Sequence, residues 1–574
     1  MATSALIPGG HTDRLHTGET GKLPALQETS INPGLSHKEK SATLPDGTRV
    51  ASLTDIGGTE AGKRRIFTRT ENNDAAQTVH LVEPGTTYTA VYDGVGVKNR
   101  GDLAAATVMT AVRDVLNNGE ALAPADLLEK TYRPFMAAED VVRITSANCI
   151  STLMFNSKDI PASRQQLDKM LADLHAANPD PESHVSKLLK RALPLNELTD
   201  IELEDAIFNI RDNLSFLGID WFLDPEHWSE IPDEYAAIVA VLPAFALKVR
   251  PSDLLNGFRE PGHGYDQHEL DNAARLVYGL ITGLPVRVGD TLDLSAEDIE
   301  TLHFRPEWLA KGSNPLSYLR RRINGCKTTA TMAQITGHHY EIAYAGDTPA
   351  FLLTVDGDVA ELLDTHKGAD TQIANMRNAY EDLRLTDSRV REQLSSDEYA
   401  RYESVLMDFY QFCNSLGGKP YNTEYVRTAF SELTDREKEE LRQTVYQGSE
   451  ADISFRLFRE RFDTMPADVQ NMILRTVFSN LIVDDVGVDR QRNPRRNIHT
   501  VSGTIAPGDM LLIGSDGFFE RISNAELSAA AADIRNGMSP EQVMLSLKKL
   551  ALARGTSDNL TAQIIIPPAR PLST

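Results

Sequence analysis

The sequence has few cysteines, and they are far apart. Only three of its 574 residues are cysteine, namely Cys149, Cys326 and Cys413, and no Cys-x-x-Cys pair occurs. A small, odd number of widely spaced cysteines argues against a disulfide framework and against a zinc knuckle, and it favours a reducing compartment. We therefore expect a cytoplasmic protein.

The sequence also lacks a long apolar run. A membrane-spanning helix needs about 18 or more consecutive apolar residues. The longest apolar stretch, residues 236–247, is shorter and contains Pro243, so it predicts a buried helix. The N-terminus has no apolar signal core either. We expect no membrane span.

Basic residues are fewer than acidic ones. The chain has 58 lysines and arginines against 82 aspartates and glutamates, which gives a formal net charge of -24. Such a charge disfavours nonspecific binding to nucleic acid or to an anionic membrane. The hydrophobic content of 41% is that of an ordinary globular protein, and 574 residues predict two or three structural units.

Strand-like and helix-like patterns alternate along the chain and predict an α+β protein. Residues 1–45 are rich in Gly, Pro, Ser, Thr and His and show no periodicity, which predicts a disordered leader. The alternative role for this leader is an address for export into a host cell as an effector. The predicted parts after it are three strand-containing segments (46–118, 321–366 and 481–566), two mostly helical insertions (119–320 and 367–480) and a tail (567–574).

Periodicity predicts several individual elements within these parts. Short apolar runs bounded by turn residues indicate buried strands, and apolar residues spaced by three or four indicate helices. The predicted strands are 77–82, 88–92, 325–330, 340–345, 350–353, 510–514 and 562–566, and the clearest predicted helices are 103–116, 236–247 and 540–553.

Three of the predicted strands end in an aspartate beside a glycine. These are Asp93-Gly94, Gly346-Asp347 and Asp516-Gly517. Three carboxylates delivered to one place would form an oxygen-only site that suits Mg²⁺ or Mn²⁺, whereas the lack of Cys and His ligands disfavours zinc. For each pair taken alone, the alternative is that Asp and Gly simply mark a turn.

Two other segments contain incomplete ligand-binding motifs. Gly57, Gly62 and Lys63 match most of a phosphate-binding loop, but Arg64 replaces the Ser or Thr that would hold Mg²⁺. We therefore predict a solvated hairpin turn there. His263 and His268 could belong to a metal cluster, but their Gly-rich surroundings and their spacing favour a polar loop.

Six short motifs occur in order along the chain. They are Arg69-x-x-x-Asn73-Asp74, Asp93-Gly94-x-Gly96, Gly325-x-x-Thr328-x-Ala330, Gly346-Asp347-Thr348, Ser515-Asp516-Gly517 and Gly555-x-x-Asp558-Asn559-x-Thr561. They cover less than half of the chain, and no single one is specific, but together they resemble the protein phosphatase 2C family, the metal-dependent Ser/Thr phosphatases. The resemblance implies the family's α/β/β/α sandwich, here with mostly helical insertions, and a phosphorylated protein as substrate.

The resemblance implies a metal-binding role for most of the acidic residues in these motifs. Asp93 would bridge two Mg²⁺ or Mn²⁺ ions, and the Gly94 carbonyl would bind one of them. Asp516 and Asp558 would complete the binding of the other ion. Asp74 would hold metal-bound water.

The remaining motif residues would complete the site. Asp347 would join Asp516 in holding a third, weaker ion. Arg69 would grip the substrate phosphate with a bidentate fork, which Lys could not reproduce. Asn559 and Thr561 would set the turn that aims Asp558. The resemblance thus makes Arg69, Asp93 and Asp516 the catalytic residues.

The chain departs from the family pattern at three positions, one of them Val97, where Gly is often found. Asn73 stands where the family usually has Glu, and the neutral Asn side chain brings no charge to the second ion. Val95 stands where some members have His as a candidate general acid. These departures keep open the alternative of a weak or inactive relative that acts as a binding scaffold. The helical insertions would shape substrate access or bind a protein partner.

Overall fold

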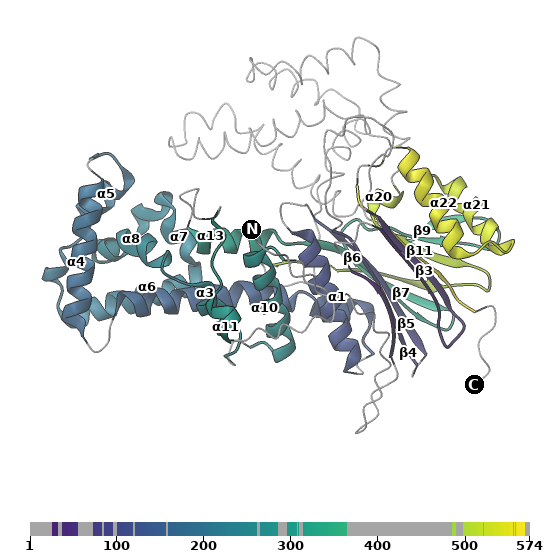
Figure 1. The fold of residues 1–574 in the computed structure, drawn as a ribbon, viewed down its shortest axis with the longest axis horizontal. Coiled ribbons are helices and arrows are strands. Elements are labelled where there is room, and N and C mark those ends of the chain that lie inside the picture. The colour runs from purple at the N-terminus through teal and green to yellow at the C-terminus, as the bar shows by residue number, and fades with distance from the viewer. Residues whose placement is uncertain are drawn as a thin grey trace, which may run out of the picture.

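The structure, a computed structural model, is a two-sheet sandwich from which a helical arm projects (Figure 1). Each sheet has six strands, and all the strand pairings are antiparallel. The residues that the structure describes are 26–32, 37–55, 73–82, 85–95, 100–118, 121–155, 159–178, 180–260, 264–284, 296–306, 308, 314–363, 485–488, 498–519, 522–554, 556 and 558–568.

The first sheet is built around three central strands that are buried on both faces. Every residue of β4 is buried, and small or β-branched side chains such as Ala75, Thr78 and Val79 allow this burial. The strand order is β1 (Leu26–Ile31), β4 (Ala75–Leu81), β5 (Thr86–Gly94), β6 (Thr328–Thr336), β7 (His339–Ala345) and β10 (His499–Thr504).

The second sheet packs against the first through an apolar layer. Val91 and Ile342 of the first sheet belong to one buried cluster with Ile513 and Ile565 of the second. The strand order is β2 (His37–Thr43), β3 (Arg49–Asp55), β12 (Leu560–Ile566), β11 (Met510–Gly514), β8 (Ala350–Leu353) and β9 (Val359–Glu361).

Helices cover the outer face of each sheet and complete the α/β/β/α order of layers (Figure 1). The Ala-rich helix α1 (Gly101–Asn117) packs on β4 and β5, as its small residues predicted. On the other side, α20 (Asp516–Phe519), α21 (Asn524–Arg535) and α22 (Pro540–Ala553) share a buried cluster with the second sheet. The predicted fold class, an α+β sandwich with helical insertions, is confirmed.

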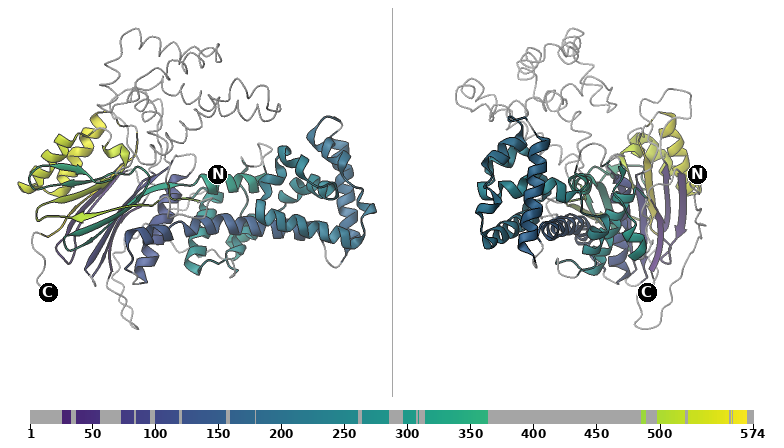
Figure 2. Two further views of the ribbon diagram at one scale, coloured as in Figure 1. Left: turned by 180° about the vertical axis from the view of Figure 1, so that it is seen from behind. Right: turned by 60° about the vertical axis from the view of Figure 1, so that its left-hand side comes forward.

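The helical arm consists of the helices between residues 121 and 325, and it extends to one side of the sandwich (Figure 2). Among its described residues there is no strand, as the helical pattern predicted. Its elements are α2 (Pro124–Lys130), α3 (Arg133–Met154), α4 (Ile160–Ala177), α5 (His184–Arg191), η2 (Leu195–Glu197), α6 (Asp200–Leu217), α7 (Ile219–Leu223), η3 (Pro225–Glu230), α8 (Asp233–Ala246), α9 (Pro251–Gly257), α10 (Gln267–Thr282), α11 (Ala296–Glu300) and α13 (Pro315–Gly325).

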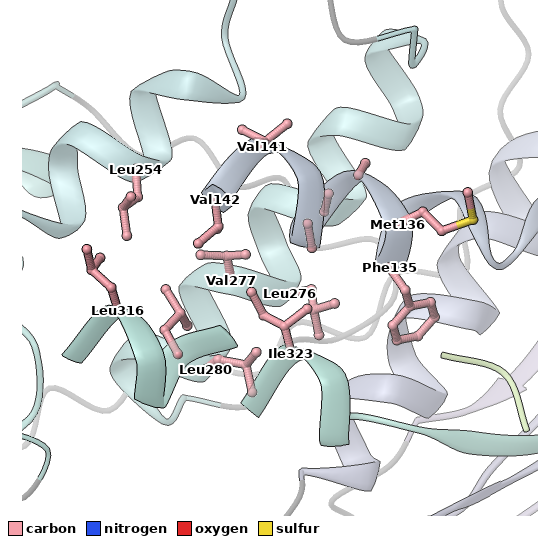
Figure 3. Packing of buried hydrophobic residues seen from close by; sticks show 14 of the residues in the cluster. Phe135, Met136, Val141, Val142, Leu254, Leu276, Val277, Leu280, Leu316 and Ile323 are labelled. Atoms are coloured by element: carbon pink, nitrogen blue, oxygen red, sulfur yellow. The ribbon is translucent and has the colours of Figure 1, made fainter. Parts of the chain in front are cut away.

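An apolar core joins the arm to the sandwich. Val142 of α3, Leu276 of α10 and Ile323 of α13 interleave at the base of the arm (Figure 3). The same buried cluster continues into Leu103 and Met109 of α1, so the arm and the first sheet share one core. None of the described helices is both long enough and apolar enough to cross a membrane.

Two sequence predictions are wrong in part. Residues 26–31 and 37–43 lie in the predicted disordered leader but form β1 and β2. Both are edge strands, and β2 alternates half-buried and exposed residues, so their polar composition hides them. The strand predicted at 325–330 begins only at Thr328, because α13 runs to Gly325. The predicted insertion 367–480 lies outside the described residues.

Candidate active site

The ends of β5 and β6 bring Asp93 beside the loop that carries Asp347. Asp93 pairs with Thr329 across the sheet, and the Thr329 hydroxyl hydrogen-bonds to the hydroxyl of Thr348. The Thr331 hydroxyl donates to the Thr348 carbonyl at 2.6 Å. Because Thr348 directly follows Asp347, these buried threonines hold the two aspartates at the same end of the sandwich.

The end of β11 is held against the start of β12, which places Asp516 beside Asp558. The backbone N–H of Ser515 donates to the Thr561 carbonyl at 2.8 Å, and the Thr561 N–H donates to the Ser515 hydroxyl at 3.0 Å. A Cβ atom on Gly517 would lie only 2.7 Å from the Asp558 Cβ. The turn that carries Asp558 therefore touches the backbone that carries Asp516.

The side chain of Asn559 connects these two halves of the site. Its Oδ1 accepts a hydrogen bond of 3.1 Å from the backbone N–H of Asn73. The Asn73 carbonyl in turn lies against Gly94, where a Cβ atom would come within 2.5 Å of it. The backbone before β4 is thus wedged between the strand ends of both sheets, and Asp74 is buried there.

Electrostatic coupling shows that the predicted carboxylates are neighbours. Burial raises the pKa of Asp93 well above its usual range, and Asp74, Asp516, Asp558 and Asp347 raise this pKa further by their negative charges. Burial and the charge of Asp516 also raise the pKa of Asp347 to about 7. Asp93 therefore lies within electrostatic reach of four aspartates from distant parts of the sequence.

The donor types at this place fit a hard divalent cation. Carboxylate and amide oxygens are the ligands that Mg²⁺ and Mn²⁺ prefer. Within the described residues, no group of three or more His, Cys, Asp or Glu side chains is arranged so that it could hold a metal ion as it stands. Asn73 is fully buried, however, and its Oδ1 and Nδ2 have no hydrogen-bond partner among those residues. Such a buried polar group is costly without a ligand.

Other residues singled out from the sequence fall elsewhere. Arg69, the incomplete phosphate-binding loop at 57–64 and His263 lie outside the described residues. His268 is described, but it is exposed in the first turn of α10 in the helical arm, so the prediction of a polar loop is wrong there.

Sequence reasoning missed Arg100, which precedes α1. Its φ of 60° and ψ of 50° place it in the left-handed region, and no other described non-glycine residue has a positive φ. This conformation costs a side-chain-bearing residue roughly 1–3 kcal/mol and persists only where neighbours enforce it. No local pattern could have revealed it, because the contacts that enforce it come from distant residues.

Because the carboxylates are crowded, we expect the free energy of unfolding of the metal-free protein to decrease as pH rises. Asp347 holds its proton in the folded state up to about pH 7, whereas its unfolded pKa is 3.8. Its contribution is therefore present at low pH and is lost as pH rises from about 4 to 7, with a ceiling of about 4 kcal/mol. Chemical denaturation in chelator across this range measures it.

The matched variant for this measurement is Asp347→Asn. It cannot titrate, so the decline in the free energy of unfolding between pH 4 and pH 7 should become shallower than in the wild type. A variant whose pH dependence matches that of the wild type would show that Asp347 does not titrate anomalously in this site.

Comparisons with known proteins add a likeness to solved structures only. No family model matches the sequence, and no curated protein matches it. The serine/threonine phosphatase of S. agalactiae is 11% identical, with 90% of this chain and 99% of that chain covered and a TM-score of 0.30. PppA of Pseudomonas aeruginosa, a regulatory component of its T6SS, is 12% identical, with 90% and 97% covered and a TM-score of 0.29. The phosphatase MsPP of Mycobacterium smegmatis is 15% identical, with 90% and 97% covered and a TM-score of 0.26.

The chain itself shows two antiparallel sheets with helices outside them, which are the layers that the six motifs implied. The α/β/β/α sandwich expected from the sequence is therefore confirmed as the fold of this chain.

Proposed function

We propose that this protein is a metal-dependent phosphatase that hydrolyses phosphoserine and phosphothreonine in proteins. The observation that carries the proposal is the convergence of Asp74, Asp347, Asp516 and Asp558 on Asp93, strongly enough to shift its pKa. A structural role for five crowded carboxylates is hard to justify, because like charges in a partly buried place repel one another. A phosphatase that works through bound divalent ions needs such a cluster.

Two Mg²⁺ or Mn²⁺ ions would be held by Asp93, the Gly94 carbonyl, Asp74, Asp516 and Asp558. Asp347 would join Asp516 at a third, weaker ion. When bound, such ions supply positive charge against the substrate phosphate and lower the pKa of a water molecule for in-line attack.

Residues around the metal ligands would position the substrate and keep the ligands aligned. Arg69 would bind the phosphate through two parallel N–H···O bonds. Asn559 fixes the backbone of Asn73, and the threonines behind Asp93 fix the Asp347 loop. Val95 carries no titratable group, so the position after Gly94 supplies no proton to the leaving oxygen.

Asn73 is expected to lower the affinity of the site for its second metal ion. The amide can offer its Oδ1 as a donor but brings no negative charge, so we propose that the second ion binds more weakly than a Glu at this position would allow. Full activity is then expected only at millimolar Mn²⁺.

Hydrolysis of p-nitrophenyl phosphate and of a phosphothreonine peptide tests the proposal. We expect turnover of both with millimolar Mn²⁺ and none in excess chelator. A phosphotyrosine peptide is the specificity control. Absence of metal-dependent turnover of either substrate would refute the phosphatase activity.

A further inference from the structure

We propose that Arg100 is a positioning residue that couples the helical arm to the Asp93-Gly94 turn and thereby sets the affinity of the metal site. The inference deepens the proposed function and rests on it. It concerns how the arm, whose role the fold leaves open, acts on the site.

The side chain of Arg100 ties the start of α1 to the end of α10. Its Nε and Nη2 donate to the two carboxylate oxygens of Asp102 at 2.8 and 2.9 Å. Nη1 donates to the Gly279 carbonyl and Nη2 to the Leu284 carbonyl, each at 3.1 Å. The last carbonyls of a helix carry its negative dipole end, which a guanidinium neutralises. Only a planar fork can serve the carboxylate and both carbonyls at once.

The backbone carbonyl of Arg100 receives a second link from the arm. The Cys326 thiol, which follows the end of α13, donates to it at 3.3 Å. Burial raises the pKa of this thiol, so Cys326 remains a protonated donor. The Leu103 N–H donates to the same carbonyl at 3.0 Å to begin α1. Two helices of the arm therefore hold one strained residue.

The next residue transmits the position of Arg100 to the proposed metal ligand. A Cβ atom on Gly101 would lie 2.4 Å from the Gly94 carbonyl carbon, and one on Gly94 would lie 2.6 Å from the Gly101 carbonyl carbon. The two backbones thus touch without any side chain between them. A shift of Arg100 must displace Gly101, and then Gly94, whose neighbour is Asp93.

Arg133 offers a control at the opposite end of α10, although its side chain is 37% exposed against 10% for Arg100. It makes the same kind of fork, with Nε and Nη2 at 2.8 and 3.2 Å from the Glu269 carboxylate, and it donates to the Gly264 carbonyl at 2.7 Å. Arg133→Lys and Arg100→Lys therefore each remove a carboxylate-binding guanidinium that also contacts α10, and only Arg100 precedes Gly101, whose backbone touches Gly94.

The test is Mn²⁺ binding by isothermal titration calorimetry, which does not depend on turnover. Arg100→Lys should raise the Kd for Mn²⁺ roughly tenfold, as loss of an outer support of a metal site typically does. Arg133→Lys should leave the Kd within about twofold of wild type, because distant sites act independently. A wild-type Kd in Arg100→Lys would overturn the inference while leaving the phosphatase proposal intact.

A double variant covers the case in which Arg100→Lys does not fold. Arg100→Gln with Asp102→Asn removes both charges, so no buried charge is left unpaired. It should show the same loss of Mn²⁺ affinity, and an unchanged Kd in this folded variant would equally refute the coupling. If the wild-type protein bound no Mn²⁺, the proposed function itself would fail, and this inference with it.

Hydrogen exchange supplies a second readout, because coupling between two sites is reciprocal. Mn²⁺ should slow amide exchange at residues 276–284 in the wild type, and this protection should disappear in Arg100→Lys. If Mn²⁺ bound to the wild type without protecting these residues, the end of α10 would not be linked to the site.

Discussion

Asp516→Asn is expected to reduce Mn²⁺-dependent hydrolysis of p-nitrophenyl phosphate by roughly 1,000-fold, because it removes a charge that the site must present to its cations. The same change should abolish stabilisation of the protein by Mn²⁺. Stability without metal should be unchanged or higher, since the charge of Asp516 acts unfavourably on both Asp93 and Asp347. Thermal unfolding with and without Mn²⁺, beside the activity assay, measures all three quantities.

Activity is expected to fall while stability without metal stays the same or rises, and this contrast makes the test specific. A variant that merely misfolded would lose stability under both conditions, whereas loss of a cation site affects only the metal-bound form. Asp173→Asn, on the exposed face of α4 in the arm, is the control and should change none of the quantities. Full metal-dependent activity in Asp516→Asn would refute the assignment of Asp516 as a ligand.

The second large effect is expected from Gly517→Ala. A Cβ atom there would lie 2.2 Å from the Asn559 carbonyl oxygen and 2.7 Å from the Asp558 Cβ, so the two strand ends must separate. Overpacking against backbone in a tight site costs about 1–3 kcal/mol. We expect a loss of stability at the upper end of that range, together with a loss of activity as Asp516 and Asp558 move apart. Denaturant titration and turnover measure the two effects.

Gly537→Ala is the control that separates a steric clash of the new Cβ atom from strain of the backbone. A Cβ atom at Gly537 would meet nothing within 4 Å, but its φ of +102° is unfavourable for alanine. Its cost should be about 1–2 kcal/mol, with activity retained. Equal activity in both variants would mean that Gly517 does not hold the two aspartates together.

Local sequence patterns predicted those parts of the fold that local chemistry determines. The helix predicted at 540–553 has the same bounds in the structure, because Ser539 caps it and Pro540 occupies its first position. The strand before Asp516 and the strand before Asp93 were likewise legible as apolar runs that end in turn residues. Such signals need no knowledge of the rest of the chain.

Features that depend on distant contacts were not predictable from local patterns. The polar edge strands β1 and β2 acquire their structure from β4 and β3, so their own residues carried little signal. The left-handed backbone of Arg100 is enforced by partners at residues 279, 284 and 326. For the same reason, the strand-end pattern indicated Asp93 and Asp516 but not Asp558, which only the ordered family motifs added to the site.

The pairing of β3 with β12 has a consequence for biosynthesis. Thr54 and Thr561 share a hydrogen bond of 2.6 Å although 507 residues separate them. The second sheet therefore cannot close until residues 560–566 have emerged from the ribosome. Because the proposed metal ligands come from both sheets, the site would form in a single late step, and a chain cut short before these residues would be inactive.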